Sequence, residues 1–154
     1  MPSATRRQAI RAGVLAVTGL AGCSQLTATP AEPPRLESVR VLNHARERRT
    51  ASVQLLLDGD VVYWGDFGIQ AADPASGDDP RNVHSEPVER SAYPDERGRW
   101  TVRVRDQAAD ERSAATFTAE AFPGGCLTLR VDVGRDSGPA VMHRADTSCG
   151  DDAE

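Results

Sequence analysis

The chain has 154 residues and a formal net charge of −5 at pH 7, with 18 basic and 23 acidic side chains. All of its basic residues are arginine, because the sequence contains no lysine. This length fits one domain. An acidic chain lacks the basic surface that phosphate binding requires, so we expect no nucleic-acid partner.

The N-terminus has the order of an export signal: charged residues, a short apolar run, and small residues before a cysteine. The apolar run from Ala12 to Leu20 is far shorter than the ~20 residues that a membrane-spanning helix needs. It therefore predicts a cleaved signal rather than a membrane span. The adjacent Arg6 and Arg7 resemble a twin-arginine (Tat) signal, whose substrates cross the membrane already folded.

Leu20, Ala21 and Gly22, followed by Cys23, resemble a lipobox, where a cysteine thiol is lipidated and becomes the mature N-terminus. The resemblance implies a signal peptide over residues 1–22, lipid on Cys23, and attachment to the extracytoplasmic face of the cell membrane. The excess of acids without lysine, behind these motifs, is similar to that of secreted lipoproteins of halophilic archaea. A GC-rich genome that favours arginine codons is the alternative explanation for the missing lysine.

The stretch from Ser24 to Arg35 is small, polar and rich in proline, which predicts a flexible linker over residues 23–35. From Leu36 onward, apolar residues alternate with polar ones, as in half-buried strands. We expect strands over 36–44, 50–58, 61–67, 99–105, 115–121, 126–133 and 140–143. Asp58-Gly59 between two of these runs is a hairpin signal, and the run from Val61 to Phe67 is apolar enough for a central strand.

The segment from Gln70 to Gly98 contains four prolines and few apolar residues. It predicts either a solvated loop or a binding loop, with a short edge strand around Val88 to Tyr93. About seven strands with polar turns predict one antiparallel β-sandwich over residues 36–149, followed by an acidic tail over 150–154. We expect a likeness to immunoglobulin domains in architecture only, because Trp100 precedes both remaining cysteines.

Cys126 and Cys149 remain after lipidation of Cys23, and outside the cytosol they most simply form one disulfide. Cys126 has the opposite parity to Leu127 and should lie at the rim. The alternative is an extracytoplasmic metal-binding or redox protein that uses these two thiols or the histidines. Those histidines lie in or beside predicted turns, where exposure is the ordinary outcome: His44, His84 and His143.

Arg99, Arg103 and Arg105 fall on one side of the cleanest alternating run. Guanidinium groups spaced by about 7 Å along a strand can hold a polymer that carries carboxylate or sulfate groups, such as a surface glycan. The alternative is that they pair with acids on neighbouring strands, for example Glu120 or Asp132.

No motif of an established catalytic or metal site occurs in the sequence, so we expect no enzyme activity, cofactor or metal. The sequence predicts a membrane-anchored surface lipoprotein whose β-sandwich is a non-catalytic binding or structural module. The expected partners are the membrane, through the lipid on Cys23, and an envelope protein or a surface glycan.

Overall fold

The computed structural model describes residues 30–72, 83–147 and 149. The predicted signal and lipidation residues lie outside these ranges, as does the acidic tail. Among the described residues, no helix has the length and apolarity needed to cross a membrane.

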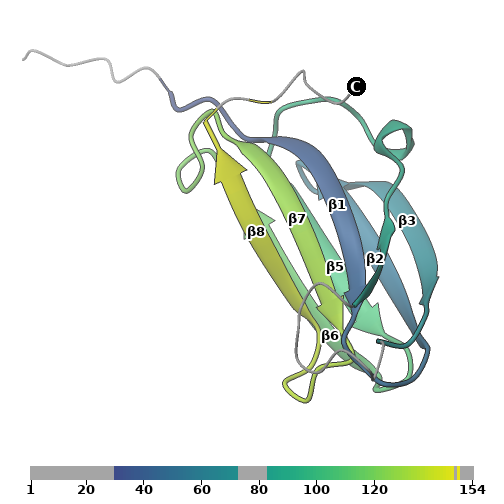
Figure 1. The fold of residues 1–154 in the computed structure, drawn as a ribbon. Helices are drawn as coiled ribbons and strands as arrows, with labels where there is room; N and C mark the ends of the chain where they lie inside the picture. The colour runs from purple at the N-terminus through teal and green to yellow at the C-terminus, as the bar shows by residue number, and fades with distance from the viewer. Residues whose placement is uncertain (1–29, 73–82, 148, 150–154) are drawn as a thin grey trace, which may run out of the picture.

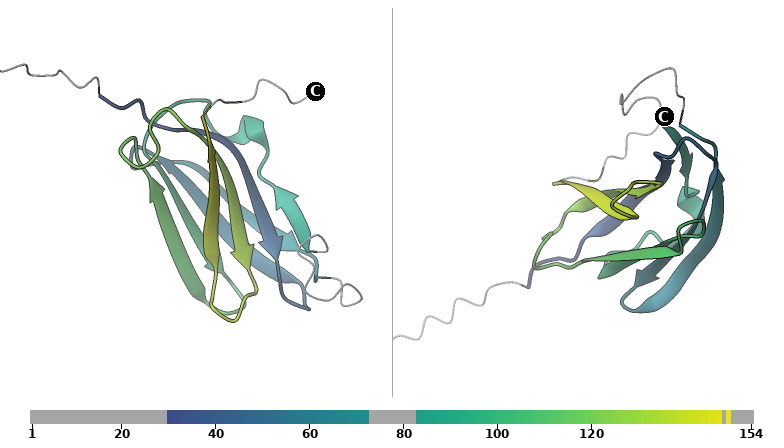
Figure 2. Two further views of the ribbon diagram at one scale, coloured as in Figure 1. Left: turned by 60° about the vertical axis from the view of Figure 1, so that its left-hand side comes forward. Right: turned by 90° about the horizontal axis from the view of Figure 1, so that it is seen from below.

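The described chain folds into two four-stranded sheets that pack face to face (Figures 1 and 2). Their strand orders are β4-β1-β7-β8 and β3-β2-β5-β6. This confirms the predicted all-β sandwich, with eight strands among the described residues; the likeness to immunoglobulin domains stays a prediction. The strands are β1 (Arg35–Asn43), β2 (Arg49–Leu57), β3 (Asp60–Ile69), β4 (His84–Pro87), β5 (Trp100–Asp106), β6 (Glu111–Phe117), β7 (Cys126–Val133) and β8 (Ala140–Asp146).

One strand pair departs from the predicted antiparallel arrangement. β1 and β7 run parallel, with Leu36 opposite Leu127 and Val41 opposite Val131, whereas every other pair of described strands is antiparallel. Parallel neighbours need a long connection, and here the chain visits the second sheet between β1 and β7. The first described strand is thereby held inside its sheet, between β7 and β4 (Figure 1).

The core lies between the sheets and follows the predicted alternation. Trp100, Val102 and Val104 of β5 are buried, while Arg103 and Arg105, which alternate with the valines, are exposed. The inward residues predicted for β1, β2 and β7 are buried in the same way: Val39, Val41, Val53, Leu55, Leu57, Leu127, Leu129, Val131 and Val133. Alternation places one apolar face of each strand toward the other sheet, which is why a period of two located the core correctly.

β3 is an edge strand, so the prediction of a central strand there was wrong. Its apolar residues are divided between the two faces: Tyr63 and Phe67 pack against the core, but Trp64 is 68% exposed. The turn before β3 follows the hairpin signal, since Asp58 and Gly59 have positive φ angles of 53° and 105°.

β6 lies four residues earlier than predicted at each end. The carboxylate of Asp106 accepts hydrogen bonds from the backbone N–H groups of Ala108 and Ala109, at 3.1 and 3.4 Å. This closes a turn after β5 so tightly that pairing resumes at Glu111. The alternation that continues past Phe117 belongs to a turn, in which the Phe122 N–H donates to the carbonyl of Thr118.

Two other element predictions also needed correction. The edge strand expected around Val88 to Tyr93 is instead β4, followed by a single 3₁₀ turn over Arg90–Ala92. Pro87 ends β4, and buried Val88 and Tyr93 hold the turn against the core. The last strand continues beyond His143 to Asp146, since β8 stays paired with β7 as far as Cys126.

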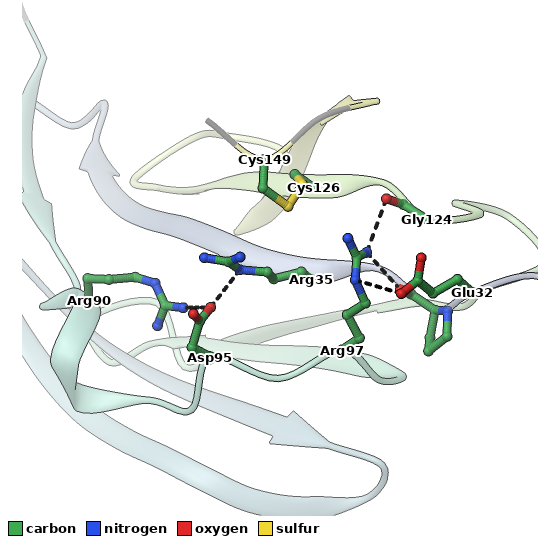
Figure 3. Close-up of a disulfide and its surroundings, with 9 residues drawn as sticks. Glu32, Arg35, Arg90, Asp95, Arg97, Gly124, Cys126 and Cys149 are labelled. Atoms are coloured by element: carbon green, nitrogen blue, oxygen red, sulfur yellow. Dashed lines mark hydrogen bonds and ion pairs between the residues drawn. A yellow bond between two sulfur atoms is a disulfide. The ribbon is translucent and has the colours of Figure 1, made fainter. Parts of the chain in front are cut away.

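The end of the sandwich where β1 begins is tied together by arginines (Figure 3). Nη1 of Arg97 donates to the carbonyls of Pro33 and Gly124 at 3.2 and 3.0 Å. Its Nε lies 3.1 Å from the Glu32 carboxylate. The last residues of the predicted linker are therefore held against the domain.

Candidate functional site

The outward face of the β3-β2-β5-β6 sheet presents its side chains in rows that cross all four strands. Gln54 is in register with Trp64 on one side and with Arg103 on the other. Arg103 in turn faces Ala114 of β6. The neighbouring row consists of Asp66, Ser52, Arg105 and Arg112.

An open hollow of about 540 Å³ lies over these two rows. Its size falls within the range of about 300–1,000 Å³ that is common for ligand sites. We call it the arginine hollow; it is lined by Ser52, Gln54, Trp64, Arg103, Val104, Arg105, Arg112, Ser113 and Ala114.

The three arginines of the hollow differ in how they are paired. Arg105 binds the carboxylate of Asp110, with Nη2 and Nε at 2.7 and 3.0 Å from Oδ1. Arg112 is 3.9 Å from the same oxygen. Arg103, in the centre, has no hydrogen bond or ion pair with any described residue. Its guanidinium is the group best placed to receive an anion from solvent.

A second carboxylate, in the row that contains Ser52, already has partners. Asp66 accepts hydrogen bonds from the hydroxyl of Ser52 at 2.5 Å and from the amide of Gln107 at 3.2 Å. The same amide also contacts the Ser52 oxygen at 2.8 Å. Asp66 is therefore engaged by Ser52 and Gln107 beside the hollow, and it forms no ion pair with Arg103.

The arginine face predicted from the sequence is only partly assembled. Arg103 and Arg105 line the hollow, but Arg99, directly before β5, contacts the turn between β2 and β3. There its backbone N–H donates to Asp58 Oδ1 at 2.9 Å, and its Nη2 is 3.4 Å from the Asp58 carbonyl.

The alternative partners named from the sequence are not the ones used. Within the described chain, neither Glu120 nor Asp132 pairs with these three arginines. Arg105 pairs with Asp110, and Arg99 hydrogen-bonds to Asp58. Asp110 belongs to the turn that joins β5 to β6. The predicted strand began four residues after the true start of β6, so the sequence did not indicate that Asp110 lies beside Arg105.

Sequence reasoning also missed Trp64, Gln54 and Arg112. Trp64 was assigned to a central strand, in which both faces would be covered. Its alternation with Tyr63, and the Gly65-Asp66 pair that follows it, were the available signals for one exposed face. Arg112 lay outside the predicted strands altogether.

The structure joins Cys126 and Cys149 by a disulfide, with their Cα atoms 5.1 Å apart, in agreement with the predicted pairing. Cys126 is the first residue of β7, at one end of its sheet, and its side chain is fully buried. It lies between Arg35 of β1 and Asp146 of β8, and the disulfide places Cys149 on it (Figure 3).

The histidines occupy three different environments. His84 is exposed, as expected. His143 lies within β8 rather than at a turn, and its ring makes edge contacts with Phe117 and Phe122. The side chain of His44 is only 19% exposed and lies 3.3 Å from the buried carboxylate of Asp132, so the expectation of a solvent-exposed histidine was wrong here.

Asp132 is a buried carboxylate at the centre of an ionic cluster on the outer face of the β4-β1-β7-β8 sheet. Arg130 Nε and Arg135 Nη2 lie 2.9 and 2.8 Å from its two carboxylate oxygens. Asp132 is thus surrounded by cations. No group of three or more histidine, cysteine, aspartate or glutamate side chains within the described ranges is arranged to hold a metal ion.

A scan against protein-family models found no match, and no curated protein matched the chain. Inferences about function therefore rest on the residues and geometry described above.

Proposed function

We propose that this protein is a membrane-anchored surface lipoprotein of a halophilic archaeon, whose β-sandwich is a non-catalytic module that binds an anionic partner through the arginine hollow. The observation that carries the binding role is the guanidinium of Arg103, which has no partner among the described residues and lines an open hollow on the outer face of the β3-β2-β5-β6 sheet. Guanidinium, amide and hydroxyl groups beside an exposed indole are groups that hold a ligand in place.

The anchor is supported by the sequence at the N-terminus. Paired Arg6 and Arg7, followed by a lipobox that ends in Cys23, would place lipid on the residue that begins the linker. Cys23 and Glu32 are nine positions apart, and Glu32 is held against the sandwich by Arg97. Fully extended, this stretch reaches about 30 Å, so the end of the domain that carries the disulfide would face the membrane.

The composition supports a saline environment outside the cell. A surface rich in carboxylates repels itself, and this repulsion is screened over about 3 Å in molar salt. Arginine is also the cation suited to binding in such conditions, because a bidentate hydrogen-bonded contact depends less on long-range charge than a simple point charge does.

Cell fractionation tests the anchor. The full chain and a Cys23→Ser variant are expressed in a haloarchaeal host, and membranes are separated from the medium. We expect the wild type in the membrane fraction and Cys23→Ser in the medium. Equal distribution of the two proteins would contradict lipid anchoring.

Retention on stripped cell envelopes tests the binding role separately. Arg103→Glu should lose retention, because it reverses the charge of the unpaired cation in the hollow. Arg40→Glu is the matched control, since Arg40 is an exposed arginine on the outer face of the other sheet. Retention that is unchanged by Arg103→Glu, or lost equally in both variants, would contradict a role for the hollow.

A further inference from the structure

We infer that the ligand of the arginine hollow is an acidic saccharide, whose ring stacks on Trp64 while its carboxylate or sulfate group binds Arg103. This inference rests on the proposed binding role and adds the chemical class of the ligand. It is carried by the arrangement, in a single row of the sheet, of one aromatic ring and one guanidinium that no described residue pairs with.

The distance between the two groups suits a sugar ring with a charged substituent. Trp64 and Arg103 are both in register with Gln54, on either side of it. Strands are spaced by about 4.8 Å, so the backbones at these two positions are about 10 Å apart. The indole and the guanidinium extend outward from these points, and a ring resting on the indole can direct its acidic group to Arg103.

The surface of Trp64 is available for stacking. The residue is 68% exposed, and Val61, in the next row of β3, is 54% exposed. A saccharide ring has an apolar face of C–H groups and polar groups around its edge, which matches a flat indole beside hydrogen-bonding side chains. Gln54 lies between the two anchors, where its amide can donate to and accept from ring hydroxyl groups.

Arg103 is the cation that can take the acidic group at the lowest energetic cost. Arg105 would first have to give up Asp110, whereas Arg103 has no partner among the described residues. Carboxylate and sulfate both present paired oxygens that fit the two parallel N–H groups of a guanidinium. Arg112, whose contact to Asp110 is 3.9 Å long, is placed to strengthen the local positive field.

The location of the hollow favours a saccharide over an acidic peptide. A peptide recognised through its backbone adds a strand to an open sheet edge. The centre of the hollow lies over β2 and β5, each of which is already paired on both sides. Recognition there depends on side chains alone, and the single exposed ring forms a platform rather than a row of side-chain pockets.

Calorimetric titration of the full chain, purified from its host in detergent, tests the ligand class. The probes are oligogalacturonate, sulfated dextran and neutral dextran, in molar KCl so that diffuse charge attraction is screened. We expect binding of at least one acidic probe and none of neutral dextran. Arg103→Gln should weaken binding about tenfold, which is the size of one hydrogen bond to a charged group.

The variants separate stacking from simple charge. Trp64→Ala should weaken binding about tenfold as well, whereas Trp64→Phe should keep most of the affinity because it retains an aromatic face. Arg103→Lys should bind more weakly than the wild type, since lysine lacks the bidentate fork. Arg40→Gln should leave the affinity unchanged.

Several results would overturn the inference. They are failure of both acidic probes to bind, equal binding of neutral dextran, no effect of Trp64→Ala, or stronger competition by polyglutamate than by the saccharides. If any of these occurs while Arg103→Glu still abolishes envelope retention, the hollow remains a binding site and only the ligand class is wrong. If one of these results occurs and Arg103→Glu also leaves envelope retention unchanged, the proposed binding function itself is wrong.

Discussion

The carboxylate of Asp132 lies 3.3 Å from Nε2 of His44, and the side chain of Asp132 has no exposed surface. Its other partners, Arg130 and Arg135, are 43% and 39% exposed. A buried carboxylate has lost its hydration, so the side chains around it must balance its negative charge. Removing such a partner leaves a buried, uncompensated charge, which destabilises the folded state. The cluster holds the end of β7 to the end of β1 and to the turn before β8.

Asp132→Asn should therefore destabilise the protein by about 3 kcal/mol, the lower end of the range for breaking a buried ion pair. The lower end is appropriate because both arginines can regain water on their exposed sides. Urea unfolding measures the loss. Asp146→Asn is the matched control: its partner Arg144 is 78% exposed, so its loss should stay below about 1 kcal/mol. Equal losses in the two variants would contradict the account.

Substitutions at Gly134 and Gly124 distinguish the energetic cost of steric crowding from the cost of backbone strain. Both have positive φ, at 72° and 65°. A Cβ at Gly134 would lie 2.7 Å from Asn43 Oδ1 and from the Cβ of Ala45, whereas the nearest atom to a Cβ at Gly124 is 3.9 Å away.

Gly124→Ala should cost about 1–2 kcal/mol from its conformation alone. Gly134→Ala should cost clearly more, because Asn43 would have to move. Asn43 is fully buried and donates to the carbonyls of Glu47, Ile69 and Gln70. Thermal unfolding of both variants measures the difference, and equal losses would exclude a close packing of Gly134 on Asn43.

The disulfide should stabilise the protein chiefly by restricting the unfolded chain. Cys126 and Cys149 are separated by 23 positions, for which the chain-entropy model gives about 3 kcal/mol. We expect the double variant Cys126→Ser and Cys149→Ser to lose about this amount in denaturant unfolding. A reductant should bring the wild type to the same midpoint. No effect of reductant on the wild type, with both thiols reactive to alkylation, would contradict the disulfide.

Tyr93 should make the free energy of unfolding fall at alkaline pH. Burial raises the pKa of Tyr93 above its ordinary value of 10.0, and the nearby Arg90 opposes the increase only in part. The folded state therefore keeps the phenol proton at pH values where the unfolded chain has lost it. The stabilisation is complete below about pH 10 and is lost as the pH rises through the raised pKa.

Tyr93→Phe should reduce this decline between about pH 9 and pH 12, although it also removes the hydrogen bond from the hydroxyl to the Glu37 carbonyl at all pH values. Part of the decline should remain, since burial also raises the pKa of Tyr63. Unfolding midpoints across this range provide the measurement. The same slope in the wild type and in Tyr93→Phe would contradict the role of Tyr93.

Salt should stabilise the protein if its acidic surface is adapted to saline conditions. The free energy of unfolding is expected to rise between about 0.15 M and 1 M KCl, as the Debye length falls from about 8 to 3 Å. Sucrose at matched osmolality should not reproduce the full increase, because it screens no charge. A constant or falling free energy of unfolding across this range would contradict adaptation to salt.

The local alternation of apolar and polar residues predicted the core of this fold, because each strand position that faces the core must hold an apolar residue. Trp100 and its neighbours in β5 alternate so strictly that only one face can be apolar. Patterning failed where contacts distant in sequence decide the outcome. The parallel pairing of β1 with β7, and the edge position of β3, depend on strand order, which no local period encodes.

The candidate site was predicted in the same partial way. Arg103 and Arg105 were identified because they share one strand. Trp64 and Arg112 come from strands far away in the sequence, and only the sheet register brings them together. That Arg103 has no partner among the described residues could not be foreseen either, because this depends on which arginine the turn residue Asp110 contacts.

The intact mass of the native, non-reduced protein extracted from host membranes tests the central claim most directly. A membrane-anchored lipoprotein predicts a polypeptide that begins at Cys23, carries lipid, and is lighter by the two hydrogens lost in the Cys126–Cys149 disulfide. A chain that retains residues 1–22 and carries no lipid would contradict the anchor, and with it the placement of the arginine hollow on the cell surface.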